Sequence, residues 1–141
     1  MLRRLPVAFI VPALIGCAAT RAGTVASSQN AATAVVQAQL DAYNRQDLDA
    51  FVKTYADDIV VTGGGKVVVQ GKDALRERYK TLFQKFPQNH ANIAERRTEG
   101  DSVVLDHEII TGRSPDKPDP WDVGWVRYEV ANGVIQKVQL P

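Results

Sequence analysis

His107 is the residue whose type and setting best fit acid–base chemistry. Alternation along residues 103–109 puts four side chains on one face of an expected strand: Val103, Leu105, His107 and Ile109. If that face lines a pocket, His107 is a titratable group among apolar walls, suited to moving a proton or orienting a ligand. Asp122 and Tyr43 are its candidate catalytic partners. The alternative, which the absence of a defined second group favours, is a structural histidine hydrogen-bonded to a neighbouring strand or to Tyr43.

The sequence indicates no metal or cofactor site. His90 and His107 are the two histidines, Cys17 is the one cysteine, and the spacing of the three is not that of metal ligands. The run Gly63–Gly65 is followed by Lys66, but it joins two expected strands and opens no helix. A hairpin turn therefore explains the glycines better than a phosphate-binding loop does.

Length and charge limit the classes of function. The chain has 141 residues, of which 45% are hydrophobic and 23% charged, as expected of one globular domain. Its formal net charge is +1, from 17 basic and 16 acidic residues. Loss of residues 1–16 removes Arg3 and Arg4 and no acid, so 15 basic face 16 acidic residues and the charge becomes −1. A nearly neutral domain is a poor fit to nucleic-acid binding, which needs clustered positive charge.

The N-terminal residues 1–16 have the pattern of an export signal. Arg3 and Arg4 precede an apolar run that is too short to span a bilayer. Residues 14–17, Leu-Ile-Gly-Cys, resemble the bacterial lipobox, in which the cysteine is lipidated and becomes the new N-terminus. An unpaired thiol is an oxidation liability in an exported protein, and acylation of Cys17 removes it. Ala18 in the next position suggests, by the same resemblance, the outer membrane facing the periplasm. The alternative is ordinary cleavage and a soluble periplasmic protein.

Helical signals fill the first half of the chain behind this signal. The small and polar residues 17–29 predict a flexible tether, and the globular domain is expected over residues 30–141. Apolar spacing predicts a helix over residues 30–45 and a second, shorter one that Asp47 caps and Asp57 and Asp58 end. A third helix is expected from Asp73 to the residue before Pro87.

Strand signals dominate the second half. A first hairpin is expected from residues 59–62 and 67–69, and four further strands over residues 90–99, 102–112, 122–131 and 134–140. Residues 114–120 form a proline-rich loop. Helices followed by antiparallel strands predict an α+β domain, with three helices of the N-terminal half on one face of a curved, mostly antiparallel sheet.

Three motifs in this order resemble the nuclear transport factor 2-like superfamily. They are Tyr43-Asn44-x-x-Asp47-Leu48-Asp49-x-Phe51-x-x-x-Tyr55-Ala56-Asp57-Asp58-Ile59, the helix start at residues 71–75, and the hairpin over residues 127–135. The resemblance covers about residues 30–140. It implies a cone-shaped fold around an apolar pocket, shared by polyketide-cyclase-like (SnoaL-like) and steroid-isomerase-like enzymes and by members without known activity.

The resemblance also shows which positions of this sequence correspond to the catalytic residues of steroid isomerases. Their mechanism needs a general-base Asp after the first strand and two donors to the developing oxyanion. The base position falls at or near Gly63, the Tyr position near Gln39, and the late Asp position near Gly124. Because glycine cannot accept a proton, we do not expect this mechanism.

The cone also implies which residues face the pocket and which face outward. The expected lining residues are Gln39, Tyr43, Tyr55, Tyr79, Phe83, Leu105, His107, Val126 and Tyr128. Trp125 is expected on the outer sheet face, as exposed apolar surface typical of an interface. Relatives often pair through that face, so the resemblance implies a homodimer there.

Three functions follow as hypotheses. The first is a lipid-tethered module that binds a small apolar molecule. The second is a polyketide-cyclase or isomerase type of enzyme that uses His107 with Asp122 or Tyr43. The third is a structural or protein-interaction domain whose pocket is filled by its own side chains. The fold alone does not choose among them.

Overall fold

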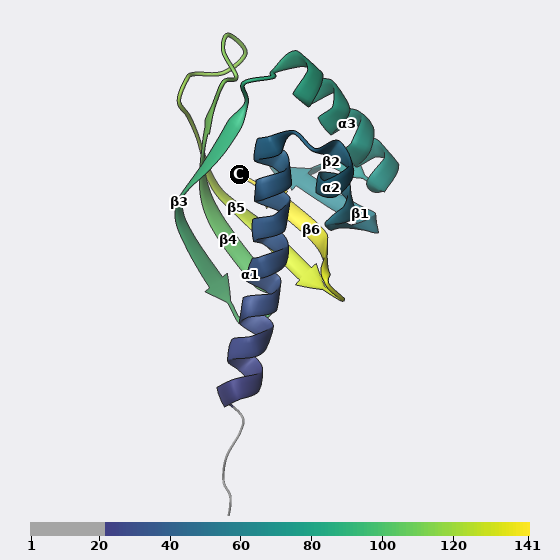
Figure 1. The fold of residues 1–141 in the computed structure, drawn as a ribbon, viewed down its shortest axis with the longest axis vertical. Coiled ribbons are helices and arrows are strands. Elements are labelled where there is room, and N and C mark those ends of the chain that lie inside the picture. The colour runs from purple at the N-terminus through teal and green to yellow at the C-terminus, as the bar shows by residue number, and fades with distance from the viewer. Residues whose placement is uncertain (1–21) are drawn as a thin grey trace, which may run out of the picture.

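A computed structural model describes residues 22–141, which form one curved sheet with helices on its concave side (Figure 1). Three helices lie in this part of the chain: α1 (Ala22–Arg45), α2 (Leu48–Lys53) and α3 (Lys72–Lys85). Its strands are β1 (Tyr55–Gly63), β2 (Lys66–Gln70), β3 (His90–Glu99), β4 (Val103–Thr111), β5 (Trp121–Ala131) and β6 (Val134–Leu140). The predicted α+β class and the cone-like arrangement are confirmed.

The six strands form one sheet in the order β2-β1-β6-β5-β4-β3. Only β1 and β6 pair in parallel, and every other neighbouring pair is antiparallel. The chain therefore starts the sheet near one edge, crosses to the other through α3, and returns strand by strand to pair β6 with β1. Helix α1 lies across the concave side of β3 to β6, and α3 covers β1 and β2 (Figure 1).

Helix α1 begins earlier than the sequence predicts. The structure has helix from Ala22, whereas residues 17–29 were expected to be a flexible tether and the helix to start near residue 30. The expectation is therefore wrong for residues 22–29, whose glycine, serines and threonine have low helix propensity but did not prevent the helix. The expected signal peptide, the lipobox with Cys17 and the tether up to residue 21 lie outside the described residues. None of the helices described is long and apolar enough to cross a membrane.

The boundary between α2 and β1 also differs from the prediction. Asp47 caps α2 as expected, since its side chain accepts a hydrogen bond from the Ala50 amide at 3.0 Å. The helix then ends at Lys53, and Asp57 and Asp58 lie inside β1 and not at a helix end. Tertiary pairing decides this boundary, because Tyr55 already pairs with Ile135 of β6.

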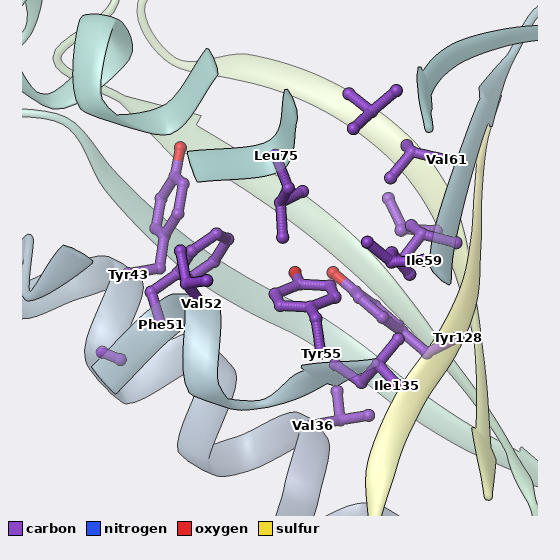
Figure 2. Close-up of a cluster of buried hydrophobic side chains, with 14 of the residues drawn as sticks. Val36, Tyr43, Phe51, Val52, Tyr55, Ile59, Val61, Leu75, Tyr128 and Ile135 are labelled. Carbon is purple, nitrogen blue, oxygen red and sulfur yellow. The ribbon is translucent and has the colours of Figure 1, made fainter. Parts of the chain in front are cut away.

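The core fills the space between the helices and the concave face of the sheet. Phe51 of α2 lies at its centre, with ring centroids 4.3 Å from Tyr79, 5.1 Å from Tyr55 and 5.9 Å from Phe83. Figure 2 shows Tyr55 and Tyr128 with their hydroxyl groups directed into the same space between the helices and the sheet. Phenol oxygens therefore project into a mostly apolar interior.

Two local contacts fix the end of the sheet where α1 and β4 meet the loops. The Asn44 side chain accepts a hydrogen bond from the amide of Ala91 at 2.8 Å and donates one to its carbonyl at 2.9 Å, which ties α1 to β3. Gly112 has φ +75° and packs so closely on the loop before β3 that a Cβ atom there would lie 2.2 Å from the Gln88 carbonyl oxygen. Only glycine fits this position.

Candidate functional site

The interior of the cone contains a cavity of about 270 Å³. This volume lies just below the range of about 300–1,000 Å³ typical of small-molecule sites. Apolar side chains form much of its wall: Leu40, Val61, Leu82, Ala91, Ile110, Trp121, Val123, Val138 and Leu140, with Pro141 at the C-terminus. All four tyrosines of the chain also line it.

Glu108 on β4 is the one acidic side chain in the cavity wall. Its Oε1 accepts a hydrogen bond of 2.5 Å from the Tyr128 hydroxyl on β5. Residue 124, opposite Glu108 in the β4–β5 pair, is a glycine, so no side chain stands beside the carboxylate at that position. No ion pair of Glu108 occurs in the described part of the chain. The carboxylate is thus held by a phenol and otherwise faces the cavity.

Burial raises the pKa of Glu108 to about 7, and nearby Asp106 adds to this. The hydrogen bond from Tyr128 and the charge of Arg96 act in the opposite direction and only partly offset the burial. Glu108 lies deep within the protein, and its side chain is partly exposed only because it borders the cavity. A carboxyl group with a pKa near 7 can give or take a proton at neutral pH.

Burial also raises the pKa of each of the four tyrosines. Their phenols therefore stay protonated at neutral pH, and each hydroxyl can donate one hydrogen bond. The Tyr43 hydroxyl donates to the side-chain oxygen of Asn89 at 3.0 Å, which fixes its direction. The Tyr128 hydroxyl likewise donates to Glu108. The cavity thus combines four phenols and one titratable carboxyl group with mostly apolar walls, an arrangement typical of ligand-binding and acid–base sites.

Asp106, two residues before Glu108 on the same face of β4, has a structural role. It is buried, and its carboxylate forms a bidentate ion pair with Arg96 of β3, at 2.6 Å to Nε and 2.7 Å to Nη2. Arg96 also donates to the side-chain oxygen of Gln37 on α1 at 2.8 Å. This pairing satisfies the buried acid and links the helix to the sheet.

The other charged lining residues are Arg78 on α3 and Arg113 after β4. Arg78 and Pro141 are exposed, so they mark the side on which the cavity opens. The Arg113 guanidinium carbon lies 4.9 Å from the ring centroid of Phe86 and 5.9 Å from that of Trp121. Aromatic rings therefore hold Arg113 at the cavity wall.

His107 does not line the cavity, so the predicted orientation of β4 is wrong. The inward face carries Val104, Asp106, Glu108 and Ile110. His107 lies on the outer face, where its Nε2 is 2.8 Å from Asp122 Oδ1 and its ring centroid is 5.3 Å from that of Trp125. The structure thus brings the expected partners His107 and Asp122 together, but away from Tyr43 and the cavity.

The nine predicted lining residues divide into two groups. The five that the structure places in the wall are Gln39, Tyr43, Tyr55, Tyr79 and Tyr128. The four that it places elsewhere are Phe83, Leu105, His107 and Val126. Phe83 packs in the aromatic core, Val126 is buried opposite Asp106, and Leu105 shares the outer face with His107. Gly63 also lines the cavity, in keeping with the base position that the resemblance assigned to it.

Glu108 and Arg113 are the functional candidates that sequence analysis missed. The period of two along β4 offers two faces, and polar residues occur on both, so the pattern does not tell which face turns inward. One sequence signal could have identified Glu108. A buried acid needs a partner, and Arg96 could supply one for Asp106, which would turn that face of β4, with Glu108, inward. In residues 22–141 no group of three or more His, Cys, Asp or Glu side chains could hold a metal ion.

Solved structures of bacterial proteins share the fold. An uncharacterized cystatin-fold protein from Novosphingobium aromaticivorans is 28% identical, with a TM-score of 0.68 over 81% of this chain and 97% of that one. A putative polyketide cyclase from Sinorhizobium meliloti is 23% identical, with a TM-score of 0.65 over 76% and 93%. A putative ketosteroid isomerase from Kribbella flavida is 14% identical, with a TM-score of 0.61 over 79% and 78%.

A comparison with functionally curated proteins finds no match. The model of the SnoaL-like domain matches residues 36–138, which include α2, α3, nearly all of the sheet and all of the cavity wall except the last two lining residues. The chain therefore belongs to the SnoaL-like domain family.

Proposed function

We propose that this domain binds a small, mostly apolar molecule in its cavity and contacts a polar group of that molecule through Glu108 and the surrounding phenols. The observation that carries this proposal is the cavity of about 270 Å³ with apolar walls, four tyrosines and one carboxylate. Apolar walls favour burial of an apolar body, and a few fixed polar groups orient it. A purely structural cone would have filled this volume with its own side chains.

The named relatives are consistent with such a ligand. The neighbours from Sinorhizobium meliloti and Kribbella flavida are called a putative polyketide cyclase and a putative ketosteroid isomerase. Both names refer to substrates that carry ketone groups. Their identities of 23% and 14% support a shared fold, so the ligand of this chain is inferred from its own cavity.

We also propose that the domain is exported and anchored to a membrane. The signal pattern of residues 1–16 and the lipobox ending at Cys17 support an exported protein anchored by lipid, with a soluble periplasmic form as the alternative. A lipid-anchored cone lies near the membrane surface, where apolar molecules partition. This placement favours a holding or transfer role for the domain.

Mass spectrometry of small molecules that co-purify with the full chain tests ligand binding. Gly63 allows a cavity-filling variant, because a Cβ there makes ordinary contacts of 3.7 Å with Leu140 and Val68. Gly63→Leu should lose a compound that the wild type retains. The matched control is Val67→Leu, which adds bulk at a 58% exposed position and should keep the compound. Retention of the same compound by Gly63→Leu would place it outside the cavity and contradict the proposal.

The second candidate is an enzyme that transfers a proton within this cavity, and Glu108 is the observation that favours it. The Glu108 carboxylate would take a proton from the carbon next to a ligand carbonyl, while tyrosine hydroxyls donate to the enolate oxygen that forms. The protonated Glu108 would then exchange its proton with solvent and return a deuteron from D₂O to that carbon, which regenerates both the ketone and the carboxylate. His107 is not suited to this step, because it lies on the outer face of the sheet.

Hydrogen–deuterium exchange of 2-tetralone, an apolar ketone with acidic C–H bonds, tests this candidate. The wild type should accelerate the exchange in D₂O, and Glu108→Gln should not. Glu77→Gln makes the same change at an exposed site on α3 and should match the wild type. Equal rates for wild type and Glu108→Gln would remove the catalytic role and leave the binding role standing.

A further inference from the structure

Arg113 enters the cavity wall as a cation whose position is fixed by aromatic rings. It follows β4 just after Gly112, and Phe86 and Trp121 lie within cation–π distance of its guanidinium carbon, at 4.9 and 5.9 Å. Burial raises the pKa of Tyr43, and the charge of Arg113 partly offsets this effect. The guanidinium therefore acts on a phenol that itself lines the cavity.

No carboxylate pairs with Arg113 in residues 22–141. Its Nε is buried and has no hydrogen-bond acceptor among the described residues. The acids of the adjoining loop and strand are engaged elsewhere. Asp116 pairs with Lys85 at 2.5 Å, Asp119 accepts from the Gly112 amide at 3.2 Å, and Asp122 lies 2.8 Å from His107 Nε2.

Glu108 does not serve as the counterion either. It is the one acidic side chain in the cavity wall, and its hydrogen bond is with Tyr128. Water can solvate a partly buried guanidinium only in part. An anion bound beside it therefore stabilises its positive charge. Its planar fork matches a carboxylate, which it can bind with two parallel hydrogen bonds.

We propose that Arg113 binds the carboxylate of the cavity's ligand, so that the ligand is a small amphipathic anion with an apolar body. The apolar body lies among the tyrosines and aliphatic side chains, and Arg78, which also lines the cavity, adds a second positive charge. Lys117, 4.5 Å from the ring centroid of Trp121, adds positive charge near the same tryptophan. The inference rests on the proposed binding function and specifies its ligand class.

A matched pair of probes tests the inference. 2-Naphthoate and 2-naphthalenemethanol share a two-ring apolar body and differ in the charge of one group. The chain has two tryptophans, so Trp125→Phe in the full chain leaves Trp121 in the cavity wall as the fluorescent reporter. In this background we expect naphthoate to bind about 10- to 100-fold more tightly than the alcohol at pH 7, the gain expected of a hydrogen-bonded charge pair.

Arg113→Met should reduce this preference to less than about threefold while the affinity for the alcohol stays unchanged, because only the charge pair is lost. Lys80→Met removes one positive charge from the exposed side of α3 and should keep the full preference. Arg113→Gln replaces the Met variant if circular dichroism shows that the latter is unfolded.

Equal affinities of the wild type for the two probes, or a preference that survives in the neutral variants, would overturn the role of Arg113 and leave the cavity's binding function intact. Saturable binding of neither probe would overturn both proposals. The two failures are therefore distinguishable in one set of titrations.

Discussion

Glu108 and Asp106 show how the same kind of side chain acquires different roles two residues apart. Both carboxylates face inward from β4, but Asp106 receives a bidentate guanidinium from Arg96, whereas Glu108 receives one phenol from Tyr128. A carboxylate with two charged hydrogen bonds is stabilised as an anion. One that faces an apolar cavity prefers to keep its proton, which makes Glu108 the titratable group of the site.

The stability of the domain should therefore depend on pH through Glu108. Its pKa is about 7 in the folded chain and 4.5 as the reference for the unfolded chain. The folded state binds this proton more tightly than the unfolded state does. The contribution of Glu108 to the unfolding free energy is therefore fully present below pH 4.5 and is lost as the pH rises to about 7. The upper limit of the loss is about 3 kcal/mol.

Urea unfolding at several pH values checks this expectation. Glu108→Gln cannot titrate, so the difference in unfolding free energy between the variant and the wild type should grow in favour of the variant between pH 4.5 and 7. Glu77→Gln on the exposed side of α3 serves as the control. A difference that stays constant over this pH range would show that the carboxyl group of Glu108 is not perturbed.

Gly112 is a second residue on which the site depends. Gly112→Ala places a Cβ atom 2.2 Å from the Gln88 carbonyl oxygen at a φ of +75°. We expect a loss of at least about 2 kcal/mol, because steric overlap adds to backbone strain. Gly133→Ala has the same φ of +75° with nothing within 4 Å, so it measures the strain alone. Equal midpoints of urea unfolding for the two variants would show that the backbone at Gly112 relaxes freely.

At the scale of elements, local patterns predicted the helices, the strands and the inward face of β5, with Val126 and Tyr128 buried, but not the inward face of β4. The N-cap Asp47, the glycine turn after β1 and the strand pattern from His90 onward are local signals, and they appear in the structure. The inward face of β4 depends on Arg96 and Tyr128, which belong to neighbouring strands. Such partners are set by tertiary pairing, which a single strand's alternation does not contain.

The N-terminal segment carries a prediction of its own. If residues 1–16 are an export signal and Cys17 is lipidated, mass spectrometry of the mature chain should show an N-terminus at Cys17 that carries acyl groups. Cys17→Ser should remove the acyl mass and release the protein from the membrane fraction. Wild-type protein that is cleaved yet unacylated would support the soluble periplasmic alternative.

At the scale of the whole molecule, the cavity forms because the helices close over the concave face of the curved sheet. Its wall takes residues from α1, β1, α3, β3, β4, β5 and β6 and ends with the C-terminal Pro141. Resemblance to the nuclear transport factor 2-like superfamily anticipated a pocket and five of its wall residues. It did not anticipate Arg113 or Glu108, because their positions in the wall follow from the turn at Gly112 and from the inward face of β4.

The most direct test of a ligand-binding cavity is fluorescence titration of the Trp125→Phe chain with 2-naphthalenemethanol. Binding beside Trp121 should give a saturable change in its emission. Addition of Gly63→Leu should abolish the change by filling the cavity, and addition of Val67→Leu should not. Absence of saturable binding, or the same affinity with and without Gly63→Leu, would contradict the account.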